Sequence, residues 1–494
     1  MTQDIRHLVV LMLENRSYDN LIGYLSQQLP GLDGLAPGMS NPVNPSVPGS
    51  PAVPFSPAQN DVIHPDPDHD FDGATLQLFG STHVPTPPAA TCNGYVASHM
   101  QTAKGSPLKG AEIMQCIAPS RIPALATLAA EFAVCDRWFS SVPGPTWPNR
   151  FFAHCATSDG LVENQVFSIP PILRRYTMPS IFEALQRADV AWNVFFHDIP
   201  QSLALTHLRQ RSHRHGFARI KRFYDAAHAG TLPAYSFIEP QYFNYADWRA
   251  NDQHGGHSVS LGDTLIAHVY EALRQNEEAW PHTMLLIVHD EHGGFFDHVP
   301  PPYDGMPTAS GHVVLHNPDG KVSHKPVFDF QRLGARVPAV VVSPFVPRGA
   351  QDLRVFEHAS IPATVRAING IAGSLNARDA TANPFHDIAS LAEMRADTPL
   401  RLPRAEDIDA ELEYRLRTYE MDDAAHSLVA ESDQNGEAPL NELQGTLTDL
   451  SDALEGGELK VAAAGIVTER RAAREIKRRM DRFLSPEESS GQTR

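Results

Sequence analysis

Four short apolar runs, separated by segments with helical spacing, constrain the fold of this chain more than any other feature. They cover residues 8–13, 190–196, 283–288 and 337–342. Continuous runs of this length, rich in β-branched residues, are typical of strands that are buried on both faces. Strands that alternate with helices indicate an α/β fold, in which a mostly parallel sheet is sandwiched by helices.

The helices of this fold are expected where apolar residues recur every three or four positions. Such spacing occurs in residues 121–135, 179–187, 258–275 and 360–371. By contrast, residues 30–90 are rich in Pro, Gly, Asn and Ser. We interpret them as a long surface insertion that contains no regular element.

The character of the chain changes beyond about residue 398, where charge rises and Gly and Pro become scarce. This change predicts a large domain over residues 1–397 and a charged helical extension over residues 398–494. Within the extension, residues 467–484 have apolar positions at helical spacing and seven Arg or Lys residues between them. A basic amphipathic helix of this kind either makes a peripheral membrane contact or docks on the acidic body of the protein.

The composition limits the classes of function. The chain of 494 residues is 42% hydrophobic with a net charge of −18, so it can bury a large core but lacks the basic surface that nucleic-acid binding needs. No apolar stretch approaches about 20 residues and no signal peptide is evident. We therefore expect a cytoplasmic protein, or export by a route not encoded at the N-terminus. The four cysteines form no CxxC pair and are expected to be free buried thiols rather than disulfides.

Polar residues follow two of the expected strands. Glu14 and Asn15 close the first run, and Asp290 and Glu291 follow the third, between two histidines. Ligands of parallel sheets bind beyond the carboxyl ends of the strands, so both pairs are expected at one sheet edge. Adjacent acids are costly to crowd together without a cation, although for Glu14 and Asn15 taken alone a helix cap is the favoured interpretation. Oxygen donors suit Ca²⁺, Mg²⁺ or Mn²⁺, whereas added imidazole would favour Zn²⁺ or Fe.

Residues 142–150 (VPGPTWPNR) contain three prolines and a glycine, which excludes an ordinary helix or a central strand. The stiff loop expected here would hold Thr146 in a fixed pose, with Asn149 and Arg150 beside it. A fixed hydroxyl is well suited to act as a nucleophile. From composition alone, a structural turn explains the segment equally well.

Three further segments carry histidines among polar residues. The Gly-rich segment before the helix expected at 258–275 suits a phosphate or a metal. For the acidic segment that contains His69, a solvated turn is the simpler interpretation. For the segment before residue 360, the simpler interpretation is that His358 caps a helix or lies in the core. The residues concerned are His69 in DPDHDF, Asp252, His254 and His257 in NDQHGGHS, and His358 in FEH.

Taken in order, these blocks resemble the phosphoesterase family that contains bacterial and plant non-specific phospholipases C and related acid phosphatases. HLVVLMLENRSYDNLIGYL is similar to the opening strand and ENRSFDH motif of that family, DPDHDF to its DPGHSF block, and CNGY to its MNGF block. FAVCDRWFSSVPGPTWPNRFFAHCATSDG resembles its nucleophile segment. IEPQYF, NDQHGGHSV, IVHDEHGGFFDHVPPP, GARVPAVVVSPFV and FEHASIPATVRAI complete the series, so the resemblance covers about residues 5–385.

The resemblance implies an alkaline-phosphatase-like fold and makes residues 1–397 a phosphoesterase catalytic domain. Two departures from the family pattern occur: Tyr18 replaces a phenylalanine, and a Gly-Gly pair replaces the proline of an H-P-x-H loop, which loosens that loop. Carried over by position, the resemblance implies metal ligands at Glu14, Asn15, Asp290 and Glu291, the nucleophile Thr146, pocket groups at His69, His254, His257 and Asn149, and substrate contacts at Asp252, Arg150 and His358.

The implied activity is hydrolysis of a phosphodiester in a phospholipid through a phosphothreonine intermediate. The implied cofactor is one divalent ion, with Ca, Mg, Mn, Zn and Fe all open. An acid phosphatase acting on small phosphomonoesters is the alternative, and a non-catalytic binding homologue is a third reading. No nucleic-acid partner is expected, and the oligomeric state is left open. A lipid substrate needs an apolar rim, and six aromatic residues could supply one or could equally well be core: Trp147, Phe151, Phe152, Phe295, Phe296 and Tyr303.

Overall fold

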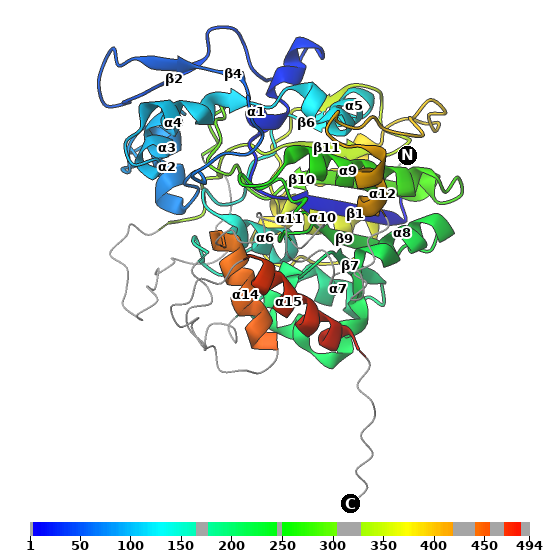
Figure 1. The fold of residues 1–494 in the computed structure, drawn as a ribbon. Helices are drawn as coiled ribbons and strands as arrows, with labels where there is room; N and C mark the ends of the chain where they lie inside the picture. Colours follow the sequence, from blue (N-terminus) through cyan, green and yellow to red (C-terminus); the bar gives the residue numbers. More distant parts are fainter. Residues whose placement is uncertain are drawn as a thin grey trace, which may run out of the picture.

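An eight-stranded sheet forms the centre of the protein (Figure 1). The computed structural model describes residues 3–164, 176–244, 249–303, 328–417, 440–454 and 469–485. The strand order is β12-β6-β11-β10-β1-β9-β7-β8, and β11 alone among these strands runs antiparallel to its neighbours. The expected α/β fold with a mostly parallel sheet is therefore confirmed. The strands are β1 (His7–Leu13), β6 (Ala133–Cys135), β7 (Trp192–Phe196), β8 (Phe217–Arg219), β9 (Tyr235–Glu239), β10 (Thr283–His289), β11 (Ala339–Val342) and β12 (Ala350–Asp352).

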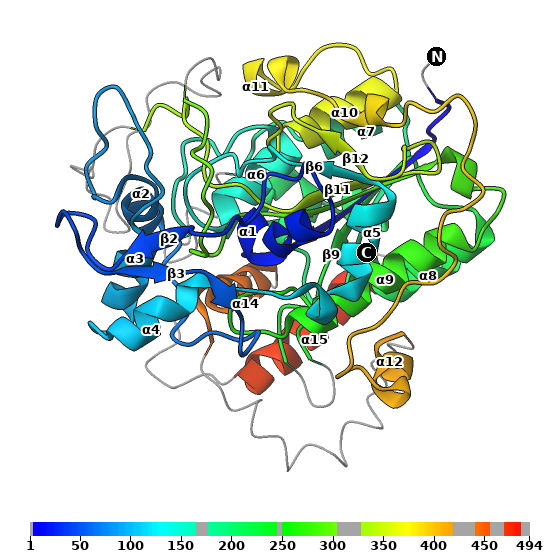
Figure 2. The ribbon, with the colours of Figure 1, turned by 90° about the horizontal axis from the view of Figure 1, so that it is seen from above.

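Helices cover both faces of this sheet. Figure 2 shows α6, α7 and α10 on one side, and α5, α8 and α9 on the other. Each face of the sheet is thereby removed from water, as its continuous apolar strands require. The helices are α1 (Tyr18–Leu21), α2 (Phe71–Phe79), α3 (Tyr95–Thr102), α4 (Pro107–Ala111), α5 (Pro123–Glu131), α6 (Thr146–Cys155), α7 (Ile181–Arg187), α8 (Ile220–Ala229), α9 (Val259–Arg274), α10 (Ser360–Ile368), α11 (Ala377–Thr381), α12 (Ala410–Arg417), α14 (Glu442–Leu454) and α15 (Glu469–Leu484).

The two central strands, β1 and β10, are almost wholly buried and pair in parallel along their full length. Leu13 lies opposite His289 at the carboxyl end of this pair. The chain therefore leaves the sheet at the same edge twice, once after each strand. This register decides where the polar residues that follow the strands meet.

Two of the expected elements differ in the structure. The helix expected over residues 121–135 ends at Glu131, because Phe132 adopts an extended conformation and residues Ala133–Cys135 form β6. β6 pairs with β11 and β12, so sheet pairing overrides the helical spacing of that segment. The helix expected from residue 179 begins at Ile181, where Ser180 and Glu183 form a capping box.

The insertion at residues 30–90 contains regular elements, contrary to expectation. It includes the small strands β2 (Ser40–Pro42), β3 (Ala52–Pro54) and β4 (Ser56–Pro57), as well as the helix α2. β4 pairs with β5 (Gln115–Cys116), and α2 packs on α3. Figure 1 shows these elements gathered at one end of the molecule. Each of the three small strands ends in a proline, and an apolar cluster shared with residues 92–116 holds the segment in place.

The helix α15 packs on the sheet domain. Ile476 and Met480 of α15 are fully buried, and the Phe483 ring lies 6.0 Å from that of Phe217 in β8. The carboxylate of Asp481 forms an ion pair with Arg219 at 2.8 Å. Of the two interpretations of this basic amphipathic helix, docking on the protein body is therefore the one that the structure bears out. The apolar face is used within the chain, which leaves a membrane contact through that face without support.

All four cysteines lie within the described residues, and each is a buried free thiol, as expected. A search of the described helices finds none that is both long enough and apolar enough to pass through a bilayer.

Candidate active site

The carboxyl ends of β1 and β10 deliver polar side chains to a single point. Because Leu13 and His289 are paired, Glu14 and Asp290 leave the sheet side by side, and the Asn15 amide N–H donates to Asp290 Oδ1 at 3.0 Å. All of these residues are fully buried or nearly so. The structure thus brings together the two strand ends as the strand-end rule predicts.

The turn after β10 brings its backbone close to Asn15. Gly293 has φ +62°, and a Cβ atom there would lie 2.1 Å from the Asn15 carbonyl oxygen, so only glycine fits. The Gly293 N–H donates to Glu291 Oε2 at 2.7 Å, while Glu291 Oε1 is buried and has no hydrogen-bond partner among the described residues. A buried carboxylate oxygen without a partner is costly unless a cation occupies the space beside it.

Thr146 is the first residue of α6 and is fully buried. Its hydroxyl lies 3.0 Å from Glu14 Oε2 and 3.3 Å from Asn15 Oδ1. The partial positive charge at the N-terminal end of the helix favours an anion at this position. The sequence-based exclusion of a helix over residues 142–150 is wrong for its second half, because Pro148 lies in the first turn, where its missing N–H costs no hydrogen bond.

The side chain of Asn149 holds the loop ahead of Thr146. Its Oδ1 accepts from the Val142 N–H at 2.9 Å, and its Nδ2 donates to the carbonyls of Val142, Gly144 and Pro145 at 3.0–3.1 Å. These contacts fix the loop that carries the nucleophile candidate. In this arrangement Asn149 positions Thr146, and its amide is not directed at a phosphate.

Arg150 is buried among the same carboxylates. Its guanidinium lies 2.5 Å from Glu14 Oε1, 3.2 Å from Asp290 Oδ2 and 3.8 Å from Glu239 Oε2. Burial alone would lower the pKa of Arg150, but these anions raise it above its usual range. Arg150 therefore acts as a fixed counter-charge beneath the ligand candidates and, in this structure, does not reach into a substrate space.

The donor set fits a divalent cation. Glu14, Asp290 and Glu291 supply carboxylates and Asn15 supplies an amide oxygen, all of which hard divalent ions accept. The single guanidinium of Arg150 balances one negative charge of the three carboxylates. Burial raises the pKa of Glu14 well above its ordinary value despite that guanidinium, so the chain alone does not fully stabilise its ionised form. A divalent ion would balance the remaining charge.

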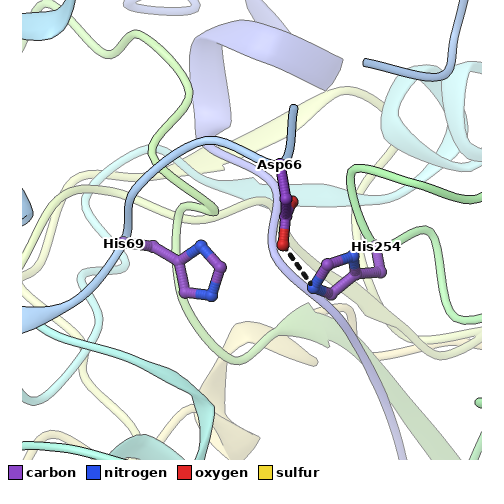
Figure 3. A group of neighbouring side chains, drawn as sticks. All are labelled: Asp66, His69 and His254. Carbon is purple, nitrogen blue, oxygen red and sulfur yellow. Dashed lines mark ion pairs between the residues drawn. The ribbon is translucent and has the colours of Figure 1, made fainter. Parts of the chain in front are cut away.

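His69 and His254 lie next to this cluster, together with Asp66 (Figure 3). His69 Nε2 is 3.4 Å from the Asn15 amide nitrogen, and His254 Nε2 is 3.4 Å from Asp66 Oδ2. Burial lowers the pKa of His254, which favours its neutral form. The solvated turn that seemed the simpler reading of the acidic segment is wrong for His69, which is only 6% exposed.

His257 lies between two carboxylates. Its Nδ1 is 2.7 Å from Asp252 Oδ1, and its Nε2 is 3.9 Å from Glu469 Oε1 at the start of α15. Burial would lower the pKa of His257, but Asp252 and Glu469 reverse the effect and raise it above its ordinary value. The backbone carbonyl of Asp252 accepts from the Glu14 N–H at 2.8 Å, which ties this pair to β1. The Asp252 carboxylate thus contacts His257 and favours the protonated form of that imidazole.

His358 supports the end of β10. Its Nδ1 accepts from the Trp138 indole N–H at 3.3 Å, so its Nε2 carries the proton that is donated to the Asp290 carbonyl. Both ring nitrogens are therefore in use, and burial lowers the pKa of this imidazole. His358 is therefore buried in the core, which is one of the two alternatives expected from the sequence. Its side chain is not directed at a substrate.

The aromatic residues considered for an apolar rim belong mostly to the core. Trp147 and Phe152 are fully buried, and Phe151, Phe295 and Phe296 are at most 3% exposed. The Trp147 indole N–H donates to Thr446 of α14 at 2.8 Å. Tyr303, which is half-buried, is the exception. The structure therefore supports the core interpretation for these five residues.

A second buried ionic network braces the region behind the strand ends. Arg336 pairs with Asp297 at 3.0 Å and with Asp19 of α1 at 3.3 Å. His298 lies 2.6 Å from Asp19 and 3.2 Å from Asp33. The network joins the helix that follows Asn15 to the segment that follows Glu291, so it holds together the two turns that carry the ligand candidates.

This network predicts a pH dependence of stability. Burial would lower the pKa of His298, but its hydrogen bond to Asp19 and the nearby negative charges raise it. A raised histidine pKa contributes stability that is complete below the unfolded pKa of about 6.5 and is lost as the pH rises through the folded value. The loss of unfolding free energy caused by His298→Gln is therefore expected to be larger near about pH 6 than near about pH 9.

Urea unfolding at the two pH values measures this difference. His83→Gln serves as the matched control, since His83 is exposed and its replacement is expected to have the same small effect at both pH values. An effect of His298→Gln that is constant or grows with pH would contradict the prediction.

Three residues at the site were not singled out from the sequence. Asp66 lies in the segment that contains His69, and Glu239 ends β9, which neighbours β1. Both could have been found, the first as a neighbour of a histidine and the second by applying the strand-end rule to one more strand. Glu469 is 212 positions from His257 along the chain, and no local pattern indicates that contact.

Comparisons with known proteins identify the family of the chain. Residues 5–372 match the model of the Phosphoesterase family. Non-specific phospholipase C6 of Arabidopsis thaliana is 35% identical over 92% of this chain and 81% of its own length. Non-specific phospholipase C3 of the same plant is 36% identical over 82% and 78%.

Among solved structures, a Vibrio parahaemolyticus protein of the alkaline phosphatase superfamily is 12% identical over 74% of this chain and 79% of its own, with a TM-score of 0.31. The family match covers most of the chain, and it contains the nucleophile candidate and all four ligand candidates. The chain therefore belongs to the Phosphoesterase family.

Proposed function

We propose that this protein is a metal-dependent phospholipase C, which hydrolyses a phosphodiester of a phospholipid through a phosphothreonine intermediate at Thr146. One observation carries the proposal: a buried threonine hydroxyl at a helix N-terminus lies within 3.3 Å of oxygens from both Glu14 and Asn15. A hydroxyl that only packed in a core would not need two polar partners of this kind. The names of the plant relatives support the choice of substrate class.

The first step is nucleophilic attack. The Thr146 hydroxyl already donates to Glu14 Oε2, which is the nearest acceptor for its proton. The threonine oxygen attacks phosphorus in line with the departing alcohol, and the phosphorus–oxygen bond to that alcohol breaks. A divalent ion held by Glu14, Asn15, Asp290 and Glu291 would lower the pKa of the hydroxyl and offset the charge of the phosphate.

The histidines would donate a proton to the leaving alcohol and contact the charged phosphate oxygens. The Asp252 and Glu469 carboxylates favour the protonated form of His257, so this residue is the best donor of a proton to the leaving alcohol. His69, which lies beside the Asn15 side chain, and its neighbour His254 would contact the phosphate oxygens. In the second step water attacks the phosphothreonine, which restores the threonine and releases the phosphorylated head group.

The choice between a diester and a monoester rests on the relatives. The names of both plant relatives specify a phospholipase C. Five of the six aromatic residues considered for an apolar rim are core, so they do not themselves support a lipid substrate. An acid phosphatase is therefore kept as the second candidate, in line with the resemblance of the motifs.

Hydrolysis of nitrophenyl phosphorylcholine and of nitrophenyl phosphate separates the two candidates. The diester is expected to be cleaved with the higher kcat/KM. Chelation of divalent ions is expected to abolish cleavage, and replacing the ion is expected to restore it. A preference for the monoester would support the phosphatase, and full activity in chelator would contradict a metal-dependent mechanism.

A further inference from the structure

We propose that the outward face of α15 and residues 209–222, together called the basic surface, dock on a lipid bilayer that contains anionic phospholipids. The proposal concerns the polar side of α15, since its apolar side is buried against the protein. It rests on the proposed function for the choice of a lipid partner, and it names the surface on which that phospholipase would work. Its closing experiment measures binding, so the two can fail separately.

Positive charge is concentrated in two segments that lie far apart in the sequence. Residues 199–224 contain six Arg or Lys residues and no Asp or Glu. The helix α15 contains seven Arg or Lys residues and three acids, of which Glu469 is buried. The whole chain has a net charge of −18, so these segments are opposite in sign to the protein as a whole. Such an asymmetry gives the molecule one face that attracts an anionic surface and others that repel it.

The two basic segments pack side by side. The Arg214 guanidinium lies over the Phe483 ring of α15, 4.9 Å from its centre. The Phe217 ring of β8 is 6.0 Å from the same ring, and Arg219 pairs with Asp481 at 2.8 Å. Figure 1 shows α15 in red at the lower edge of the molecule, away from β2 and β4. The two segments therefore form one continuous surface.

The side of α15 that faces solvent is a stripe of arginines. Arg471, Arg474, Arg478 and Arg482 are all exposed, and steps of three and four residues place them on one side of the helix. The opposite side, which includes Ile476, is buried. Packing of the apolar side on the protein body thus fixes the direction in which the arginines point.

Part of this charge is not neutralised by the protein itself. Arg222, Arg471 and Arg474 are exposed, and the described part of the chain places no carboxylate in an ion pair with any of them. By contrast, Arg478 pairs with the Glu475 carboxylate at 2.6 Å. Exposed cations without an internal partner are available to the head groups of anionic lipids.

The position of α15 favours a lipid surface over other polyanions. The helix begins at Glu469, whose Oε1 is 3.9 Å from Nε2 of His257 in the candidate active site. From there its 16 residues extend about 24 Å. A bilayer on this face brings phospholipids close to the site proposed to cleave them, whereas a nucleic acid bound here would have no such relation to the site. Because the apolar side of α15 is buried, the contact is electrostatic and the helix stays at the membrane surface.

Co-sedimentation of the full-length protein with vesicles tests the proposal. Vesicles of phosphatidylcholine alone are compared with vesicles in which part of the lipid is phosphatidylglycerol. The wild type is expected to bind only the second kind, and raised salt is expected to release it, because salt screens the attraction. One variant that combines Arg222→Gln, Arg471→Gln and Arg474→Gln is expected to partition into the anionic vesicles at least about 10-fold more weakly.

A second variant, which combines Lys104→Gln, Lys109→Gln and Arg348→Gln, is the matched control. All three residues are exposed, and the variant loses the same charge as the first one. Lys104 and Lys109 belong to the α3–α4 region, and Arg348 precedes β12, at the sheet edge opposite β8. The control is expected to bind as the wild type does. Circular dichroism checks that both variants are folded.

The outcomes separate this inference from the proposed function. Equal binding of the wild type to neutral and anionic vesicles, or equal binding of the two variants to anionic vesicles, would overturn the inference. A wild type that binds duplex DNA but not the vesicles would overturn the choice of a lipid partner.

Activity gives a second, independent measurement. The kcat/KM of the first variant on nitrophenyl phosphorylcholine is expected to be unchanged, whereas its hydrolysis of phospholipid in anionic vesicles is expected to fall in step with binding. Charge-dependent binding by a protein without phosphoesterase activity would refute the proposed function alone. Hydrolysis of vesicle phospholipid without charge-dependent binding would refute this inference alone.

Discussion

Thr146→Ala is expected to lower the turnover of nitrophenyl phosphorylcholine by about 10³-fold or more, because it removes the proposed nucleophile. The hydroxyl lies 3.0 Å from Glu14 Oε2 and 3.3 Å from Asn15 Oδ1, and the side chain is fully buried. Substrate contacts elsewhere are unaffected by the change, so kcat is expected to fall far more than KM rises. Steady-state kinetics on the metal-loaded protein measures both constants.

Two comparisons make this result specific to the hydroxyl. Thr146→Ser keeps the oxygen and removes only a methyl group, so it is expected to retain measurable turnover. Mass spectrometry of acid-quenched protein is expected to find phosphate on residue 146 in the wild type and none in Thr146→Ala. A Thr146→Ala variant that keeps more than about a tenth of wild-type turnover would show that another group attacks the phosphorus.

Arg150→Met is expected to destabilise the fold by about 3–5 kcal/mol in the absence of divalent metal. The buried guanidinium lies within 3.8 Å of carboxylates from Glu14, Asp290 and Glu239, and its removal leaves three buried anions without their counter-charge. A divalent ion would restore part of that charge. The unfolding free energy of the variant should therefore rise more steeply with metal concentration than that of the wild type.

Urea unfolding with and without chelator gives both quantities. Arg348→Met is the control, because Arg348 also pairs with acidic residues but its side chain is 56% exposed, and its loss should cost less than about 1 kcal/mol. A cost below about 1 kcal/mol for Arg150→Met would mean that the carboxylates do not need the guanidinium.

The fold could be predicted where the apolar pattern is continuous. Runs such as residues 8–13 and 283–288 are buried on both faces, so their composition alone indicates central strands. β6 could not be predicted, because three residues carry too little periodicity to compete with the helical spacing before them. β11 was expected as a strand but its antiparallel direction was not, because direction is set by the path of the chain between strands.

The candidate site was predictable where it follows the strand ends. Glu14 and Asp290 meet because β1 and β10 are neighbours, and parallel strands end at one edge. The role of each residue within the site depends on tertiary packing, which a local sequence pattern does not predict. Asn149 holds the loop before Thr146, and Arg150 is sealed beneath the carboxylates, although sequence reasoning expected both to face a substrate.

The contact between His257 and Glu469 has a consequence for how the site matures during synthesis. Domains generally fold from their N-terminal side as the chain emerges. The strand ends, Thr146 and the histidine loops are all made before residue 469, yet His257 gains its second carboxylate only when α15 docks. A nascent chain on the ribosome would thus hold this imidazole less strongly protonated than the finished protein does. Completion of the proposed proton donor would therefore follow the synthesis and docking of α15.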